Sequence, residues 1–332
     1  MSFFYVENYY KMNNQSDVYV AGFEVNERRI HVAKLWKNGV AQNLSSGKVH
    51  AEAQSVYVSG GIVYVVGHEY NDNFINVVKL WKNDTVLELT DGISAGKAHS
   101  VFVAGRDVYV AGREWKEQGN LIARLWKNGI AQNLSEKAFI ADAQSVFVSG
   151  NDVYVAGFER NSKRVYTAKI WKNGVGKNLT DGKEHASAYS VFVSGGDVYV
   201  TGYEWNKKDI NVDILWRNGK PKNLSNGTYD AETFSVFVSN NDVYVVGYEK
   251  NENNVNVAKL WINGVAHNLT NGHSPAYAQS VYVSGSVVYV AGREMNDQNI
   301  YVAKLWINGV ARDLSDGTCN AYAQSVFVKQ SE

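Results

Sequence analysis

Seven glutamates recur at one fixed interval, and carboxylates are groups that can bind cations or transfer protons. They lie 45 residues apart, at Glu24, Glu69, Glu114, Glu159, Glu204, Glu249 and Glu294. A base stands at the equivalent later position in six copies: Lys34, Lys79, Arg124, Lys169, Lys259 and Lys304. The series is either a ring of ligand-binding carboxylates or a set of ion pairs, and the nearly matched counts favour pairs because buried charges need partners. The fifth copy has Ile214 in place of the base, beside Asp213, so Glu204 is expected to lack a partner.

The period itself indicates a repeat architecture. Its clearest marker is a tryptophan before a tight turn, at Trp36, Trp81, Trp126, Trp171, Trp216, Trp261 and Trp306. Six of the seven turns are Asn-Gly, which tolerates positive φ and is the strongest short hairpin signal. One copy reads as four strands, at 55–58, 63–69, 76–81 and 86–90. Four antiparallel strands repeated seven times resemble a seven-bladed β-propeller.

The resemblance covers residues 16–328 and concerns the architecture, not a family of known activity. We therefore predict an all-β fold in one domain, residues 1–332, with seven blades and a non-repeat segment at 1–15. The first copy lacks its inner strand, while 325–328 at the other end is left over. That last strand is predicted to complete the first blade and close the ring, which removes an exposed edge. The aromatic residues within 1–12 are predicted to form a lid or an extra strand on this blade.

Most of the repeated residues are interpreted as structural. The tryptophans are expected to pack between blades, because they have the largest area to bury. A glycine recurs from Gly22 to Gly292, and glycine inside a strand usually marks a bulge or a close backbone approach. The serines that begin the inner strands, from Ser55 to Ser325, are expected to bind backbone groups rather than to act as nucleophiles.

Composition narrows the possible partners. Lys plus Arg and Asp plus Glu are 33 each, so there is no electrostatic case for nucleic acid or an anionic membrane. The apolar runs are strand-sized, which predicts no transmembrane helix. The N-terminus has no charged segment followed by an apolar core, so no signal peptide is recognised and a cytoplasmic location is the default expectation. We also expect a monomer.

The candidate site lies on the connections that vary between copies. The connections after the second and fourth strands of each copy are longer and less uniform, and antiparallel alternation places them at one end of the ring. Aromatic residues mixed with basic and polar ones at this end suit ligand recognition. The candidate ligand-binding residues are Trp115, Trp205, Tyr70, Arg113, Arg293, Tyr203, Tyr248, His99, Tyr277 and Tyr322.

These features predict a non-catalytic binding module, a platform for protein interaction that uses this face. One alternative is a lectin-like propeller with several equivalent carbohydrate sites. A second alternative is a hydrolase or lyase with a site at the mouth of the central channel. No catalytic residue, metal-binding set or cofactor site is recognised, since no histidine spacing matches a zinc site and no carboxylate pair stands out. The expected partner is a protein or a glycan.

Overall fold

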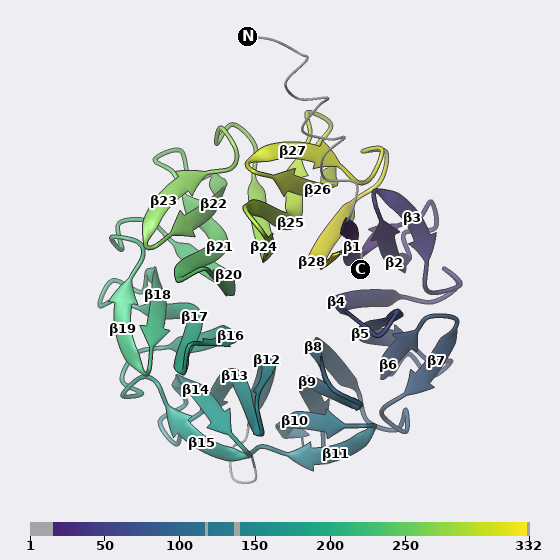
Figure 1. Cartoon of the computed structure of the whole chain (residues 1–332), viewed down its shortest axis with the longest axis horizontal. Coiled ribbons are helices and arrows are strands. Elements are labelled where there is room, and N and C mark those ends of the chain that lie inside the picture. Colours follow the sequence, from purple (N-terminus) through teal and green to yellow (C-terminus); the bar gives the residue numbers. More distant parts are fainter. Residues whose placement is uncertain (1–15, 117–118, 136–139, 331–332) are drawn as a thin grey trace.

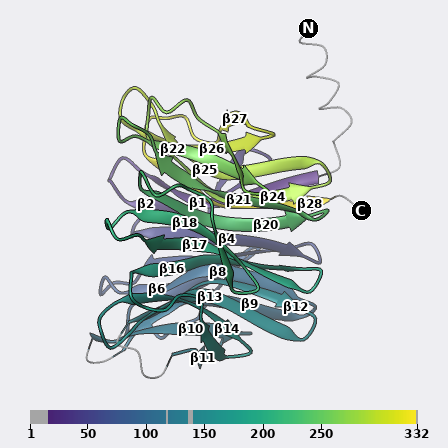
Figure 2. The same ribbon diagram turned by 90° about the vertical axis from the view of Figure 1, so that its left-hand side faces the viewer.

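The computed structural model describes residues 16–116, 119–135 and 140–330, and every element within them is a β-strand. The strands form seven four-stranded antiparallel sheets arranged around a central channel (Figure 1). The predicted all-β, seven-bladed propeller is therefore confirmed. In the perpendicular view the sheets of neighbouring blades lie one over another (Figure 2).

Each blade contributes one strand to each of four concentric layers. From blade one to blade seven, the innermost strands are β28 (Ala321–Gln330), β4 (Ala51–Ser59), β8 (Gly96–Ala104), β12 (Ala141–Ser149), β16 (Ala186–Ser194), β20 (Ala231–Ser239) and β24 (Ala276–Ser284). The second strands are β1 (Ser16–Val25), β5 (Ile62–Tyr70), β9 (Asp107–Trp115), β13 (Asp152–Arg160), β17 (Asp197–Trp205), β21 (Asp242–Lys250) and β25 (Val287–Met295). The third strands are β2 (His31–Lys37), β6 (Asn76–Lys82), β10 (Leu121–Lys127), β14 (Tyr166–Lys172), β18 (Asn211–Arg217), β22 (Asn256–Ile262) and β26 (Tyr301–Ile307). The outer strands are β3 (Val40–Asn43), β7 (Thr85–Glu88), β11 (Ile130–Asn133), β15 (Val175–Asn178), β19 (Lys220–Asn223), β23 (Val265–Asn268) and β27 (Val310–Asp313).

The ring is closed by the last strand. β28 pairs antiparallel with β1, and Val328 lies opposite Val18, so blade one is built from both ends of the chain. This confirms the predicted closure, and β1 gains a hydrogen-bonded neighbour that it would otherwise lack. The predicted lid at 1–12 lies outside the described residues.

A bulge in the inner strand explains the repeated glycine. The pairing of β4 with β5 shifts between Ala53 and Ser55, which leaves Gln54 as the extra residue. A Cβ on Gly67, opposite this bulge, would lie 1.9 Å from the Glu52 carbonyl oxygen, so no other residue fits. The bulge also explains why 55–58 was predicted too short for β4: Gln54 interrupts the alternation, and the strand begins before it.

The predicted packing of the tryptophans is confirmed. Trp126 is 1% exposed and packs with Tyr64 and Val66 of the preceding blade, and its six equivalents are buried in the same way. The serine series also has the expected role. Ser55 Oγ accepts the backbone N–H of Val101 in the next blade at 3.2 Å, and six further bonds of this kind complete a circle around the channel.

The glutamate series forms ion pairs within the blades. Glu114 lies 2.7 Å from Arg124, Glu69 lies 3.7 Å from Lys79, and four more pairs follow the same pattern, namely Glu24 with Lys34, Glu159 with Lys169, Glu249 with Lys259 and Glu294 with Lys304. Glu204 makes no ion pair within the described residues, and burial raises the pKa of its carboxyl group. The interpretation as ion pairs, including the gap in blade five, is therefore correct.

Candidate site at the channel mouth

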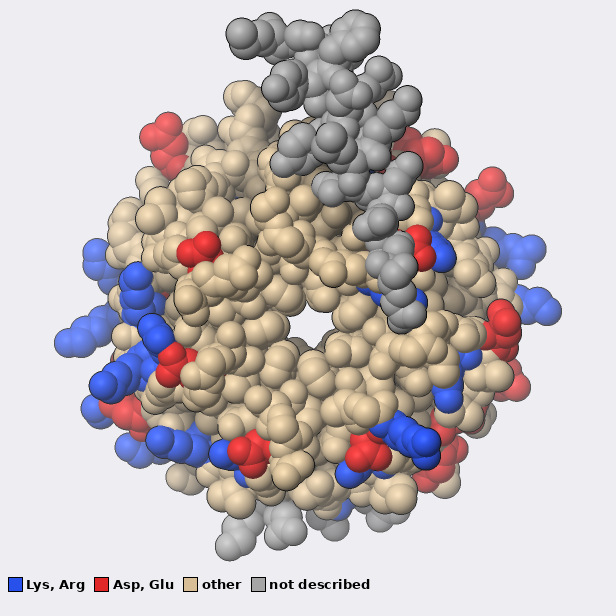
Figure 3. Space-filling view, in the orientation of Figure 1, with Lys and Arg blue, Asp and Glu red and all other residues tan. Residues whose placement is uncertain are grey.

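A second set of polar side chains lies at the mouth of the channel, where the inner strands begin. Here residues near the end of a second strand contact residues near the start of the next blade's inner strand. These contacts between blades join Arg113 to Asp142, Tyr248 to Tyr277 and Arg293 to Tyr322. Because the backbone is repeated and these side chains are not, their chemistry changes from blade to blade. Figure 3 views the ring from its other end, where β1 begins and β28 ends, and shows that the central channel is open.

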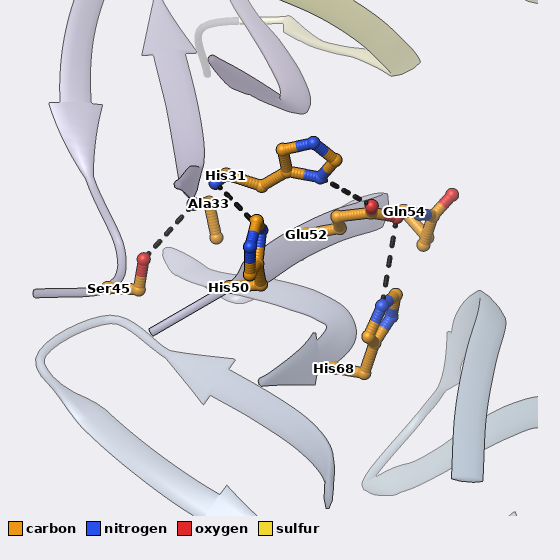
Figure 4. Close-up of polar contacts among 7 residues, drawn as sticks. All are labelled: His31, Ala33, Ser45, His50, Glu52, Gln54 and His68. Carbon is orange, nitrogen blue, oxygen red and sulfur yellow. Dashed lines mark hydrogen bonds and ion pairs between the residues drawn. The ribbon is translucent and has the colours of Figure 1, made fainter. Parts of the chain in front are cut away.

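Glu52 holds a histidine between blades one and two (Figure 4). His31, the first residue of β2, places Nδ1 2.8 Å from Glu52 Oε1, while Gln54 Nε2 donates to Oε2 at 3.0 Å. The backbone N–H of His31 donates to His50 Nδ1 at 3.1 Å, and the imidazole stacks on Phe23 at 4.8 Å. The carboxylate thus fixes the Nδ1–H tautomer of His31, and Nε2 makes no hydrogen bond within the described residues. The side chain remains 34% exposed, so solvent reaches it.

His68 lies on the other side of Glu52 and is chemically different. Its Nε2 lies 3.7 Å from Glu52 Oε2, too far for a hydrogen bond, and its Nδ1 is buried without a partner. Burial, reinforced by the positive charge of Lys97, lowers the pKa of His68 to about 3. His68 is therefore neutral at physiological pH, and His31 is the histidine that is open to solvent.

Arg113 and Asp142 form a complete ion pair between blades three and four. Arg113 Nη1 lies 2.6 Å from Asp142 Oδ2, and the Asp142 side chain is fully buried. His99 Nε2 lies 3.3 Å from Asp142 Oδ1 without hydrogen-bond geometry. The two predicted ligand-binding residues here, Arg113 and His99, are therefore engaged with a carboxylate of the protein itself.

Arg293 has the same position in blade seven as Arg113 in blade three, but it meets tyrosines. Its guanidinium carbon lies 4.1 Å from the ring centroid of Tyr277, 5.1 Å from Tyr322 and 5.3 Å from Tyr301. Nε is buried without a hydrogen bond, and no carboxylate within the described residues pairs with the group. Burial lowers the pKa of Arg293. The structure thus brings three predicted site residues, Arg293, Tyr277 and Tyr322, into one cluster.

Glu232 is the reverse case, an acid that meets a tyrosine. It shares its position with Asp142, but Tyr203 stands where Arg113 would be, and its hydrogen-bond donor is Asn211 Nδ2 at 2.9 Å. Burial and the nearby Asp230 raise the pKa of Glu232 to about 7. Its carboxyl group therefore exchanges a proton near neutral pH.

Three polar residues lie in the core between blades five and six, where other blades have apolar residues. Asp213 occupies an alanine position of the repeat, is fully buried, and neither carboxyl oxygen has a hydrogen-bond partner within the described residues. Burial, with Glu249 next in importance, raises its pKa well above the usual range. Thr201 and Thr233 also replace apolar repeat residues here, and their hydroxyls lie 2.7 Å apart.

The remaining predicted residues are dispersed around the mouth. Trp115 ends β9 and is 44% exposed, whereas Trp205 lies 4.6 Å from the His185 ring and Tyr70 lies 5.7 Å from the His50 ring. Tyr248 connects the Glu232 region to Arg293, because its ring is 5.1 Å from Tyr277. These residues therefore line one ring but do not converge on a single point.

Sequence reasoning missed His31, and it did not select Glu52, Asp142 or Glu232 from the many polar residues at this end. A signal was present, since the three acids occupy one repeat position in alternate blades. What was missing was the inter-blade offset that places His31 of one blade against Glu52 of the next.

A groove of about 440 Å³ lies at the opposite end of the ring, between blades five and six. Its cation Arg217 is already bonded to Asp197, and its other lining residues are mainly turn residues, lysines and apolar side chains. It offers no general base, so the channel mouth is the better candidate for chemistry. Within the described residues, no helix is long and apolar enough to cross a membrane, and no set of three or more His, Cys, Asp or Glu side chains is placed to hold a metal ion.

Comparison with known proteins places this fold beside hydrolases. A puromycin-hydrolysing peptidase from Mycobacterium tuberculosis is 10% identical with a TM-score of 0.61, and the match covers 90% of this chain and 51% of that one. A puromycin hydrolase is 11% identical with a TM-score of 0.63, over 91% and 52% of the two chains. The β-propeller domain of the Trilobed protease from Pyrococcus furiosus is 11% identical with a TM-score of 0.56, over 91% and 95%. No protein-family description and no curated protein matches this chain.

At these identities the likeness shows the fold, and this chain spans about half the length of the two peptidases. It nevertheless corrects the predicted function. The three matches are a puromycin-hydrolysing peptidase, a puromycin hydrolase and the propeller domain of a protease, and none of them is a lectin or an interaction platform by name. The prediction of a non-catalytic platform, with its lectin-like alternative, is therefore wrong. The Trilobed domain is described as having an open velcro topology, whereas the ring of this chain is closed by β28.

Proposed function

We propose that this propeller takes part in hydrolysis at the mouth of its channel, with His31 as general base and Glu52 as the group that orients it. The observation that carries the proposal is the 2.8 Å contact between His31 Nδ1 and Glu52, which leaves Nε2 free on a partly exposed ring. A carboxylate bound to one imidazole nitrogen while the other faces a reactant is the arrangement of base and orienting group in many hydrolases.

The nucleophile would be water. No hydroxyl or thiol within the described residues hydrogen-bonds to His31. Nε2 takes a proton from the water as its oxygen bonds to a carbonyl carbon, and the resulting imidazolium is stabilised by Glu52. When the bond to the leaving group breaks, the proton passes from Nε2 to that group, which restores the neutral imidazole. An acylaminoacyl peptidase from Pyrococcus horikoshii, which matches this fold at 13% identity with a TM-score of 0.56 over 91% of this chain and 51% of its own, supports an acylated amino acid or a short peptide as the substrate class.

The test is a hydrolysis assay on the purified chain with N-acetylated amino acid p-nitroanilides and short N-acetylated peptides. The expected result is turnover that falls at least a hundredfold in His31→Gln and in Glu52→Gln, as loss of acid–base catalysis typically does. His267→Gln, a histidine on the exposed outer strand β23, is the matched control and should keep full activity. Absence of turnover on the whole panel, or equal activity in His31→Gln, would overturn the proposal.

A further inference from the structure

A partly buried cation lies near the proposed catalytic pair, without a counter-ion among the described residues. Arg293 lies against Tyr277, Tyr301 and Tyr322, and its guanidinium makes no ion pair or hydrogen bond within the described residues. Arginine carries five N–H donors that are ordinarily used when the group is buried. Here the ring faces stabilise the charge but leave the donors unused.

The unpaired state is not imposed by the fold. Arg113, at the same position in blade three, is satisfied by Asp142 of the next blade at 2.6 Å. In blade seven the next inner strand offers Tyr322 at that position instead. The scaffold can therefore place a carboxylate against this arginine, and in blade seven it does not.

We propose that Arg293 and its three tyrosines bind the carboxylate group of a ligand. A planar guanidinium matches a carboxylate through two parallel hydrogen bonds. The Asn256 amide donates to the Tyr277 hydroxyl at 2.6 Å, which orients this tyrosine beside the guanidinium. A phosphate is disfavoured because phosphate sites generally use clusters of arginines, and Arg293 is alone within its cage.

The site is continuous with His31. Tyr322 stacks on Phe23 at 4.5 Å, and Phe23 stacks on His31 at 4.8 Å. The rings of Tyr322 and Phe23 thus lie between Arg293 and the general base, at the same mouth of the channel. If the proposed hydrolytic function holds, on which this step rests, the substrate carries a free carboxylate that Arg293 anchors while His31 acts on a nearby acyl bond.

The anion site can be tested without any activity, by calorimetric titration with sodium benzoate and with benzamide at constant ionic strength. The wild type should bind benzoate and not benzamide, its uncharged analogue. Arg293→Met should weaken benzoate binding at least tenfold, whereas Arg160→Met, at the partly exposed end of β13, should bind as the wild type does. Tyr322→Asp, which supplies the counter-ion found beside Arg113, should also abolish binding and serves if Arg293→Met does not fold.

Two results would overturn the inference: benzoate binding that is unchanged in Arg293→Met and Tyr322→Asp, or equal binding of benzamide. Failure of the wild type to bind benzoate would overturn it as well. His31→Gln separates this inference from the proposed function, because it should bind benzoate normally even though hydrolysis is lost. Hydrolysis that survives in His31→Gln, with benzoate binding intact, would refute only the catalytic role.

Discussion

Arg113 and Arg293 occupy the same repeat position in two blades, and in the part of the chain that the structure describes only Arg113 has a counter-ion. Arg113 pairs with a fully buried Asp142, whereas Arg293 meets the rings of three tyrosines. Glu232 completes the comparison as an acid at the repeat position of Asp142, with Tyr203 at the repeat position of Arg113 and Asn211 as its hydrogen-bond donor. The repeat thus presents a full pair, a cation alone and an acid alone within one scaffold. The comparison shows that a charged residue without a counter-ion at the mouth results from the amino acid at that position, because the backbone is repeated in each blade. The ring does not need such unpaired charges to hold together.

The largest expected effect separates the two arginines. Arg113→Met leaves Asp142 buried without its cation, which should lower the free energy of unfolding by about 3–5 kcal/mol. Arg293→Met removes a partly buried charge that has no counter-ion among the described residues, so its cost should be below about 1 kcal/mol. Urea unfolding of both variants measures the difference. Equal losses would show that the tyrosine cage is as structural as the ion pair.

The raised pKa of Glu232 predicts that the free energy of unfolding depends on pH. The pKa of Glu232 is raised to about 7 in the folded protein, so the native state holds this proton more tightly than the unfolded state. The contribution of Glu232 to the free energy of unfolding is fully present below pH 4.5, the pKa of the unfolded state, and it is lost as the pH rises toward 7. Glu232→Gln should therefore raise the free energy of unfolding at pH 8 by about 2 kcal/mol, after allowance for residual exposure, and remove the slope between pH 5 and 7.

The pH series is measured by urea unfolding at several pH values. Glu27→Gln, in the exposed turn between β1 and β2, is the control for loss of one negative charge. A slope that survives in Glu232→Gln would assign the titration to another group.

The ion pairs within the blades repeat the comparison on a smaller scale. Glu249 has Lys259, and both side chains are about 15% exposed, whereas Glu204 has no base because Ile214 replaces it. Glu249→Gln should cost about 2 kcal/mol, less than a fully buried pair. Glu204→Gln should cost nothing or stabilise slightly, since burial already raises the pKa of that carboxyl. Thermal unfolding of the two variants would contradict this account if Glu204→Gln melted earlier.

The smallest expected effect concerns Trp115, which the fold does not require. It is 44% exposed, so Trp115→Ala should change the free energy of unfolding by no more than about 0.5 kcal/mol. Trp126→Ala, in the repeated series, is the matched variant and should cost about 3–5 kcal/mol. A large loss in Trp115→Ala would place this tryptophan in the packing between blades and would remove it from the variable mouth.

The sequence was sufficient for the fold because each structural role is repeated seven times. The tryptophans, the glycine at the bulge and the ion pairs could each be interpreted from what stays constant. The candidate site consists instead of repeat positions whose side chains differ from blade to blade. His31 and Glu52 lie in different blades, and the bulge at Gln54 sets where the inner strand begins, so their contact depends on an inter-blade offset that no periodicity encodes. Arg293 and Tyr322 were predicted as site residues from their residue types. That no carboxylate among the described residues pairs with Arg293 could be seen only in the structure.

The most direct test of the whole account is steady-state kinetics on N-acetyl-phenylalanyl-phenylalanine and its C-terminal amide, with wild type, Arg293→Met and His31→Gln. The account predicts that wild type prefers the free carboxylate. Arg293→Met should raise KM at least tenfold for that substrate alone, and His31→Gln should lower kcat for both. If wild type hydrolyses neither substrate, or if Arg293→Met affects the acid and the amide equally, then the charge left unpaired at the channel mouth does not mark a site for substrate, and the account is contradicted.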